Sequence, residues 1–187
     1  MDITFEIVIK IFWAVVVVLG FALLFNTPKR ALWVAALLGA LGFGLKTLLI
    51  HTVIEGQLVL ASLAGASLVG ILGVYFAHRV HTPPIIFTIP AVINMIPGKL
   101  GYEFVIGILK LVTAGKNQDV DFQFFLQVMN AGLSAGFILL ALTSGIIFPI
   151  LFLNTKSVKN KDLNKIMKNE LIRKPQIARY KRAKRRL

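Results

Sequence analysis

The sequence predicts an all-α integral membrane protein with five transmembrane helices, the fourth of them broken, followed by a basic cytoplasmic tail. Of the 187 residues, 57% are hydrophobic and the mean hydropathy is +0.79, so a water-soluble fold would leave large apolar areas exposed. Five long apolar stretches occupy residues 1–153, which we expect to form one membrane domain. Most of the net charge of +13 belongs to residues 154–187, which hold 13 Lys and Arg against 2 acidic residues.

The five apolar stretches are each long enough to cross a membrane. A hydrocarbon core ~30 Å thick needs about 20 helical residues. The first three stretches fit single crossings, and the last two are longer than one crossing needs. Asp2 and Glu6 stand where a signal peptide would carry Lys or Arg, so we expect the first stretch to remain in the mature protein. The stretches lie at about 7–25, 31–50, 58–77, 85–112 and 122–153.

The loops between the stretches predict the orientation. Lys29 and Arg30 follow the first stretch and Arg79 follows the third, whereas residues 51–57 contain no Lys or Arg. Loops rich in Lys and Arg face the cytoplasm, so five crossings place the N-terminus outside and the C-terminus inside. An arrangement in which residues 85–112 re-enter without crossing would export Lys29 and Arg30, and we therefore prefer five crossings.

Small residues recur at four-residue spacing in three of the stretches. Such stripes let helix backbones approach closely in a membrane. They predict close packing within this chain, or contact with a partner subunit, which could be a second copy of the chain. The residues are Ala35 and Gly39, then Ser62, Ala66 and Gly70, then Gly132 and Gly136.

The fourth stretch carries helix breakers. Pro97 removes a backbone donor, Gly98 lowers the cost of unusual backbone angles, and Pro90 adds a second weak point. We expect two half-helices, at about 85–96 and 99–112, that meet near the middle of the membrane. Irregular backbone at that depth is tolerated only where protein surrounds it or where it lines a watery cavity.

Ionisable residues follow the break on one helix face. Lys99, Glu103 and Lys110 lie within about 40° of one another around a helix, and such residues turn away from lipid. Lys99 would attract a carboxylate near the start of the half-helix, Glu103 could accept a coupled proton, and Asn94 could hydrogen-bond opposite them. The alternatives are an ordinary proline kink and a simple pair between Lys99 and Glu103.

Three other charged residues lie near the outer ends of the first two stretches. Lys10, Lys46 and Glu55 are interpreted as side chains that reach for the membrane interface rather than as substrate ligands. Glu6 precedes Lys10 by four residues and predicts a helical ion pair.

Enzymatic and metal chemistry find no support in the sequence. Cysteine is absent, and His51, His78 and His81 do not occur in a metal-binding frame. No carboxylate pair or set of nucleophile and base suggests an intramembrane enzyme. We expect no metal, no cofactor and no catalytic residues.

Three sequence blocks resemble the threonine/serine exporter family. They are GFALLFNTPKRALWVAALLGALG at 20–42, FTIPAVINMIPG at 87–98 and MNAGLSAGFILLALTSGI at 129–146. The resemblance spans residues 5–153 and is closest to the small subunit of split, two-chain members, which corresponds to the C-terminal half of single-chain exporters. The matching positions are Asn26, Pro28, Arg30, Pro97, Gly98, Tyr102 and Asn130.

The resemblance implies an exporter of the bacterial inner membrane, assembled from this chain and a larger partner. Family members are associated with export of threonine and serine driven by the proton-motive force, and some split members with succinate or related dicarboxylates. The chain departs from the family pattern at Asn94, where a proline is usual, and at Lys99 and Glu103, where smaller or uncharged residues are usual. These departures bear on the substrate more than on the transport role.

The tail predicts contact with lipid. Apolar residues recur with helical periodicity between 163 and 171, which indicates a short amphipathic helix, and RYKRAKRR at 179–186 is polybasic. Anionic lipids are the preferred partner of such a segment. Nucleic-acid binding is disfavoured, because no recognised fold or aromatic platform accompanies the basic run.

The leading hypothesis is one subunit of a secondary exporter for small carboxylate-bearing metabolites such as threonine and serine. A dicarboxylate exporter subunit and a purely structural membrane subunit are the alternatives. The predicted substrate path is lined by Asn94, Lys99, Tyr102, Glu103 and Asn130.

Overall fold

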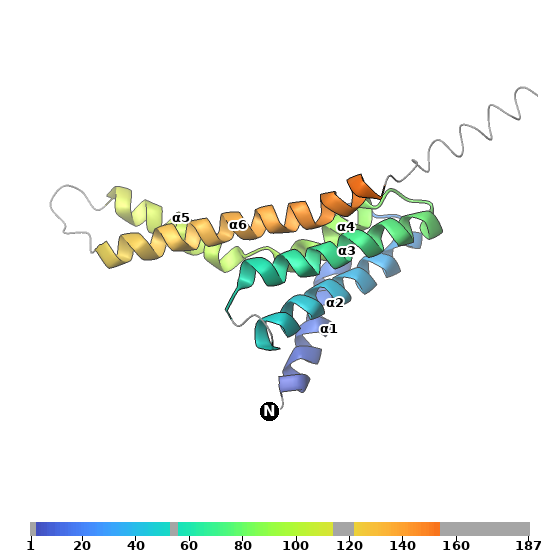
Figure 1. The fold of residues 1–187 in the computed structure, drawn as a ribbon, viewed down its shortest axis with the longest axis horizontal. Coiled ribbons are helices and arrows are strands. Elements are labelled where there is room, and N and C mark those ends of the chain that lie inside the picture. Colours follow the sequence, from blue (N-terminus) through green and yellow to red (C-terminus); the bar gives the residue numbers. More distant parts are fainter. Residues whose placement is uncertain (1–2, 53–55, 114–121, 154–187) are drawn as a thin grey trace, which may run out of the picture. The chain divides into compact units, whose positions relative to one another are not determined.

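The computed structural model describes residues 3–52, 56–113 and 122–153, which belong to one compact unit (Figure 1). These ranges contain helices and no strand, which confirms the all-α membrane class. The predicted tail helix and polybasic run lie outside the described residues, as does Glu55. The helices are α1 (Ile3–Leu24), α2 (Lys29–Thr52), α3 (Leu58–Val80), α4 (Ile85–Val92), the 3₁₀ turn η1 (Ile93–Met95), α5 (Gly98–Thr113) and α6 (Phe122–Phe152).

Four helices, α1, α2, α3 and α6, are long and apolar enough to cross a membrane, and the pair of α4–η1 with α5 meets the same criterion when the two parts are taken together, as a broken span or a re-entrant loop. The two parts of that pair meet at 64°. In Figure 1, α4 lies beside α3 and α5 lies beside the N-terminal half of α6. The bent pair therefore connects the end of α3 to the start of α6.

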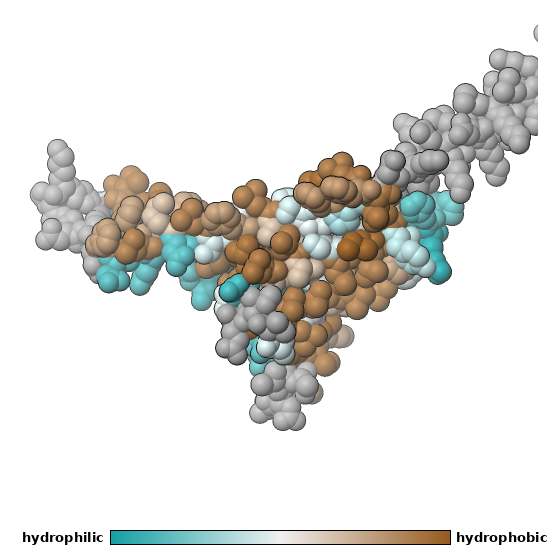
Figure 2. Space-filling view, in the orientation of Figure 1, coloured by the Kyte–Doolittle hydropathy of each residue, from teal (hydrophilic) through white to brown (hydrophobic). Residues whose placement is uncertain are grey.

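Large apolar side chains cover the outside of the described bundle (Figure 2). Trp13 of α1, Trp33 of α2 and Phe137 of α6 are all more than half exposed. A water-soluble protein would bury such residues, whereas in a bilayer they face hydrocarbon. Figure 2 also shows hydrophilic residues gathered along α5 and α6 and at the end of α3.

The backbone of α3 touches those of its neighbours α2 and α6 at glycines. A Cβ on Gly70 would lie 2.6 Å from the carbonyl oxygen of Gly145 in α6, and one on Gly65 would lie 2.7 Å from that of Gly42 in α2. Pro149 lacks the amide that would bond to the Gly145 carbonyl, which leaves this oxygen free to face α3. The small-residue stripe of α3 therefore packs within the chain.

α1 and α3 end in similar turns. Asn26 and His81 adopt the left-handed backbone conformation, with φ of 55° and 51°, and a Thr–Pro pair follows each. The amides of Thr27 and Thr82 bond to carbonyls five residues earlier, at 2.9 and 3.3 Å, as in Schellman caps. Arg30 joins the two turns, because its Nη2 donates to the His81 carbonyl at 3.0 Å.

The weak point expected at Pro90 is not a break. α4 continues through Pro90, whose side chain is fully buried. Proline lacks the amide that would bond to the carbonyl of Ile86. Thr27, in the turn after α1, supplies the missing donor, since its Oγ1 donates to the Ile86 carbonyl at 3.3 Å. The helix stays closed here because a second segment satisfies the free carbonyl.

Thr27→Val should lower the stability of the bundle. The change keeps the shape of this buried side chain but leaves the Ile86 carbonyl without a donor, which costs about 1–2 kcal/mol. Thr52→Val is the control, since exposed Thr52 bonds only to the Leu48 carbonyl of its own helix. Thermal unfolding in detergent should show a lower midpoint for Thr27→Val alone, and equal midpoints would contradict the role of Thr27.

Candidate functional site

The fourth span breaks where the sequence predicts it. The 3₁₀ turn ends at Met95, Ile96 is extended (φ −63°, ψ 128°), and α5 begins at Gly98. Pro97 has no amide to offer the carbonyl of Ile93, which accepts the amide of Ile96 instead at 3.2 Å. The predicted break at Pro97–Gly98 is thus confirmed.

Lys46 of α2 reaches the break. Its Nζ donates to the carbonyl oxygen of Met95 at 3.0 Å. In a continuous helix this carbonyl would accept the amide of Lys99, and because Ile96 is extended, Lys46 takes the place of that donor. The expectation that Lys46 reaches for the membrane interface is wrong: its half-buried side chain bonds to the interior of the bundle.

Asn94 lies in the 3₁₀ turn just before the break, and its side chain faces α1. Its Nδ2 donates to the carbonyl of Ala14 at 2.7 Å. Together with Lys10, Trp13 and Phe43, it lines a hollow of about 330 Å³ between α1 and α2. Asn94 therefore fastens the 3₁₀ turn to α1 and does not lie opposite the ionisable face of α5.

A groove of about 490 Å³ runs between α5 and α6. Only Gly107 of α5 is fully buried, which leaves most of this half-helix without a neighbour other than α6. Within the groove, Ser134 Oγ donates to Oδ1 of Asn130 at 3.3 Å. The polar residues of its lining are Tyr102, Glu103, Lys110, Gln127, Asn130 and Ser134.

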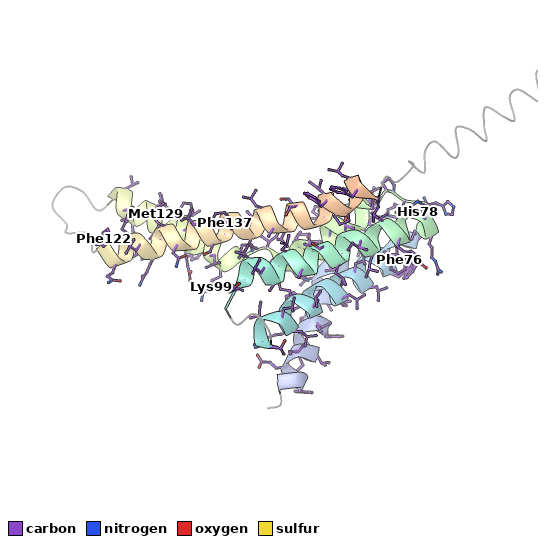
Figure 3. All side chains as sticks on the ribbon, in the orientation of Figure 1. Phe76, His78, Lys99, Phe122, Met129 and Phe137 are labelled. Carbon is purple, nitrogen blue, oxygen red and sulfur yellow. The ribbon has the colours of Figure 1, made fainter. Side chains whose placement is uncertain are left out.

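Lys99 and Glu103 form the pair that the sequence offered as an alternative. Lys99 Nζ lies 3.7 Å from Glu103 Oε1, and the Lys99 side chain is 87% exposed at the start of α5 (Figure 3). Glu103 is 47% exposed and lines the groove, whereas Lys99 does not. Of the predicted path, Tyr102, Glu103 and Asn130 thus share the groove, whereas Lys99 pairs with Glu103 from outside its lining and Asn94 faces α1.

Sequence reasoning missed the position of Lys46. A lysine inside a long apolar helix was the available signal, because ionisable residues within membrane segments face the protein interior. The position of Lys46 near the end of its apolar stretch suggested the membrane interface instead.

Glu6 and Lys10 form the predicted ion pair on α1, with Lys10 Nζ 2.6 Å from Glu6 Oε1. In the ranges that the structure covers, no group of three His, Asp or Glu residues could hold a metal ion.

Comparison with known proteins places the chain in a family. Residues 10–152 match the family model described as threonine/serine exporter, ThrE. This match covers well over half of the chain. The chain belongs to the threonine/serine exporter family. The match includes all of α2 to α6, and therefore both the broken span and the groove.

One relative of this exporter-family chain is an uncharacterized protein of Haemophilus influenzae. The two are 35% identical over 147 residues, which cover 78% of this chain and 48% of the relative. The exporter-family chain thus spans about half the length of the curated relative that it matches. No solved structure matches it.

Proposed function

We propose that the chain is one subunit of a secondary active exporter that moves threonine and serine out of the cell across the bacterial cytoplasmic membrane. It works with a larger membrane partner of the same family. Membership of the exporter family supports the transport role. The match to about half the length of the relative is compatible with a chain that acts together with a second subunit.

The groove between α5 and α6 carries this proposal. Glu103, Asn130 and Ser134 are polar groups on membrane segments, and each lies in a groove that nothing in the described bundle closes. Polar side chains facing lipid are costly, so they face water, substrate or a partner. A subunit that covers α5 and α6 would turn the groove into a closed path beside the broken span.

The polar groups of the groove suit proton-coupled export of a hydroxy amino acid. Glu103 would accept the coupled proton, and Tyr102 and Asn130 would hydrogen-bond the substrate. Broken helices in transporters commonly place substrate sites near the bilayer midplane, where free backbone groups meet the ligand. The break at Pro97 lies five residues before Tyr102.

The ends of the helices support a cytoplasmic C-terminus and an external N-terminus. Arg30 binds the turn after α3, so Lys29, Arg30 and Arg79 all belong to one end of the bundle. Loops with Lys and Arg remain on the cytoplasmic side. In this orientation the basic tail is cytoplasmic, where anionic lipids would bind it.

Efflux from cells tests the proposal. Cells without other threonine exporters should be loaded with labelled threonine, serine or succinate and should express the chain with its larger partner, with either subunit alone, or with neither. We expect threonine and serine efflux only with both subunits. Efflux of succinate alone would assign the dicarboxylate class instead. If efflux persists without this chain, the chain does not form the transport path, and it is a structural subunit or has no part in this transport.

A further inference from the structure

We propose that Lys46 is the binding site for the carboxylate of the transported substrate. This inference deepens the proposed export function and rests on it. The sequence pointed to Lys99 for this role, but the Lys99 side chain is 87% exposed. Lys46 is half-buried and reaches the break itself.

Among the described residues, the ammonium of Lys46 has no counter-charge. Ion pairs in the described ranges join Glu6 to Lys10 and Lys99 to Glu103, and neither pair includes Lys46. Its hydrogen bond goes to the neutral carbonyl of Met95. An ammonium has three donors, so two remain for a ligand. A half-buried cation in a membrane segment is costly without an anion, and a carboxylate would supply one.

The face of α3 that packs against Lys46 carries a second polar group. A Cβ on Gly65 would be 3.4 Å from the Cβ of Lys46 and 3.2 Å from Cε of Met95. Gly42 meets Gly65, and the two helices run in opposite directions, so the residue one turn after Gly42 faces the residue one turn before Gly65. These turns hold Lys46 and Ser62.

Ser62 is unsatisfied in the structure. Its side chain is completely buried, and its Oγ has no hydrogen-bond partner among the described residues. Buried hydroxyls almost always have a partner, so one that lacks a partner calls for an explanation, and a ligand or water that binds there is one. A carboxylate held by Lys46 could accept the Ser62 hydroxyl proton as a second hydrogen bond.

A hollow lies next to the neighbours of Lys46 and Met95, although neither residue is part of its lining. Phe43, one turn before Lys46, and Asn94, next to Met95, both line the hollow of about 330 Å³ between α1 and α2. The carbonyl end of a broken helix also suits a substrate ammonium group, because carbonyls accept hydrogen bonds from cations. The cation of Lys46 would bind the carboxylate of an α-amino acid, and the Met95 carbonyl, which already accepts from Lys46, has a second lone pair that could accept from the ammonium group.

Thermal stabilisation by ligands tests this assignment in membranes that contain the full chain. Saturating L-threonine or L-serine should raise the aggregation midpoint by about 5 °C or more. L-threoninol, in which a hydroxymethyl group replaces the carboxylate, should produce no shift. Lys46→Met should abolish the shift, Lys46→Arg should retain it in part, and Lys99→Met should retain it fully. Stabilisation by succinate instead of the amino acids would keep the carboxylate site and change the substrate class.

Three results would overturn the assignment: a shift that survives Lys46→Met, a shift lost equally in Lys99→Met, or equal stabilisation by threonine and threoninol. The last comparison uses the unaltered chain, so it decides even if Lys46→Met does not fold. Efflux measured in the same cells separates the two proposals. Export without any carboxylate-induced shift refutes the Lys46 site alone, and a Lys46-dependent shift without export refutes the exporter function alone.

Discussion

Gly70→Leu should destabilise the bundle strongly. A side chain at this position would meet the Gly145 carbonyl oxygen at 2.6 Å, Pro149 Cγ at 3.0 Å and the Ile146 Cα at 3.1 Å. Two of these atoms belong to the backbone of α6 and cannot rotate away. Overpacking typically costs about 1–3 kcal/mol, and more where backbone must move. We expect the unfolding midpoint to fall by roughly 4–10 °C, or the variant to aggregate on extraction.

Gly136→Leu provides the matched control for Gly70→Leu. Gly136 is also a helical glycine of a small-residue stripe, but a Cβ there would meet no atom within 4 Å. The substitution should change the stability by no more than about 0.5 kcal/mol. Size-exclusion profiles after graded heating would compare the two variants directly. Equal loss of folded protein in both would show that close contact between α3 and α6 does not hold the bundle together.

Glu103→Gln should reduce threonine efflux to the level of cells that lack the chain. Glutamine matches the shape of glutamate and retains hydrogen bonding, but it cannot take up and release a proton. Glu103 lines the groove between α5 and α6, and its only ion-pair partner in the described ranges is the exposed Lys99. An exposed pair of this kind contributes about 0–1 kcal/mol to stability, so the variant should fold normally.

Lys99→Met separates proton coupling from the ion pair itself. Lys99→Met removes the cationic partner of the ion pair with Glu103, and the Lys99 side chain does not line the groove. We expect most of the efflux to remain, with an unchanged unfolding midpoint. If Lys99→Met abolished efflux while Glu103→Gln preserved it, the assignment of the proton to Glu103 would be wrong.

The sequence predicted the features that depend on local chemistry. Pro97 and Gly98 predicted the break, because a proline removes a backbone hydrogen-bond donor and a glycine tolerates unusual backbone angles in any sequence context. The helical spacing of Glu103 and Lys110 also predicted a shared face, and both residues line the groove. Lys99 lies in the first turn of α5, where the break turns its side chain outward, and the helical angle alone could not show this.

The features that sequence reasoning missed depend on contacts between distant segments. Pro90 does not open its helix because Thr27, 59 residues away from Ile86, satisfies the carbonyl that it leaves free. Lys46 is 49 residues from Met95 in the sequence and meets it only because α2 passes the break. Such partners follow from the packing of the helices, and no local pattern encodes them.

The central claim is that a polar path runs beside the broken span, along the groove between α5 and α6. Because the chain has no cysteine, single cysteines can be introduced along α5 and tested with a water-soluble thiol reagent in membranes. We predict fast reaction at Glu103, Ile106 and Lys110, slowed by threonine, and slow reaction at Val105, Leu109 and Val112 on the opposite face. Equally slow reaction on both faces, unaffected by threonine, would contradict the path and favour a dry, structural seam.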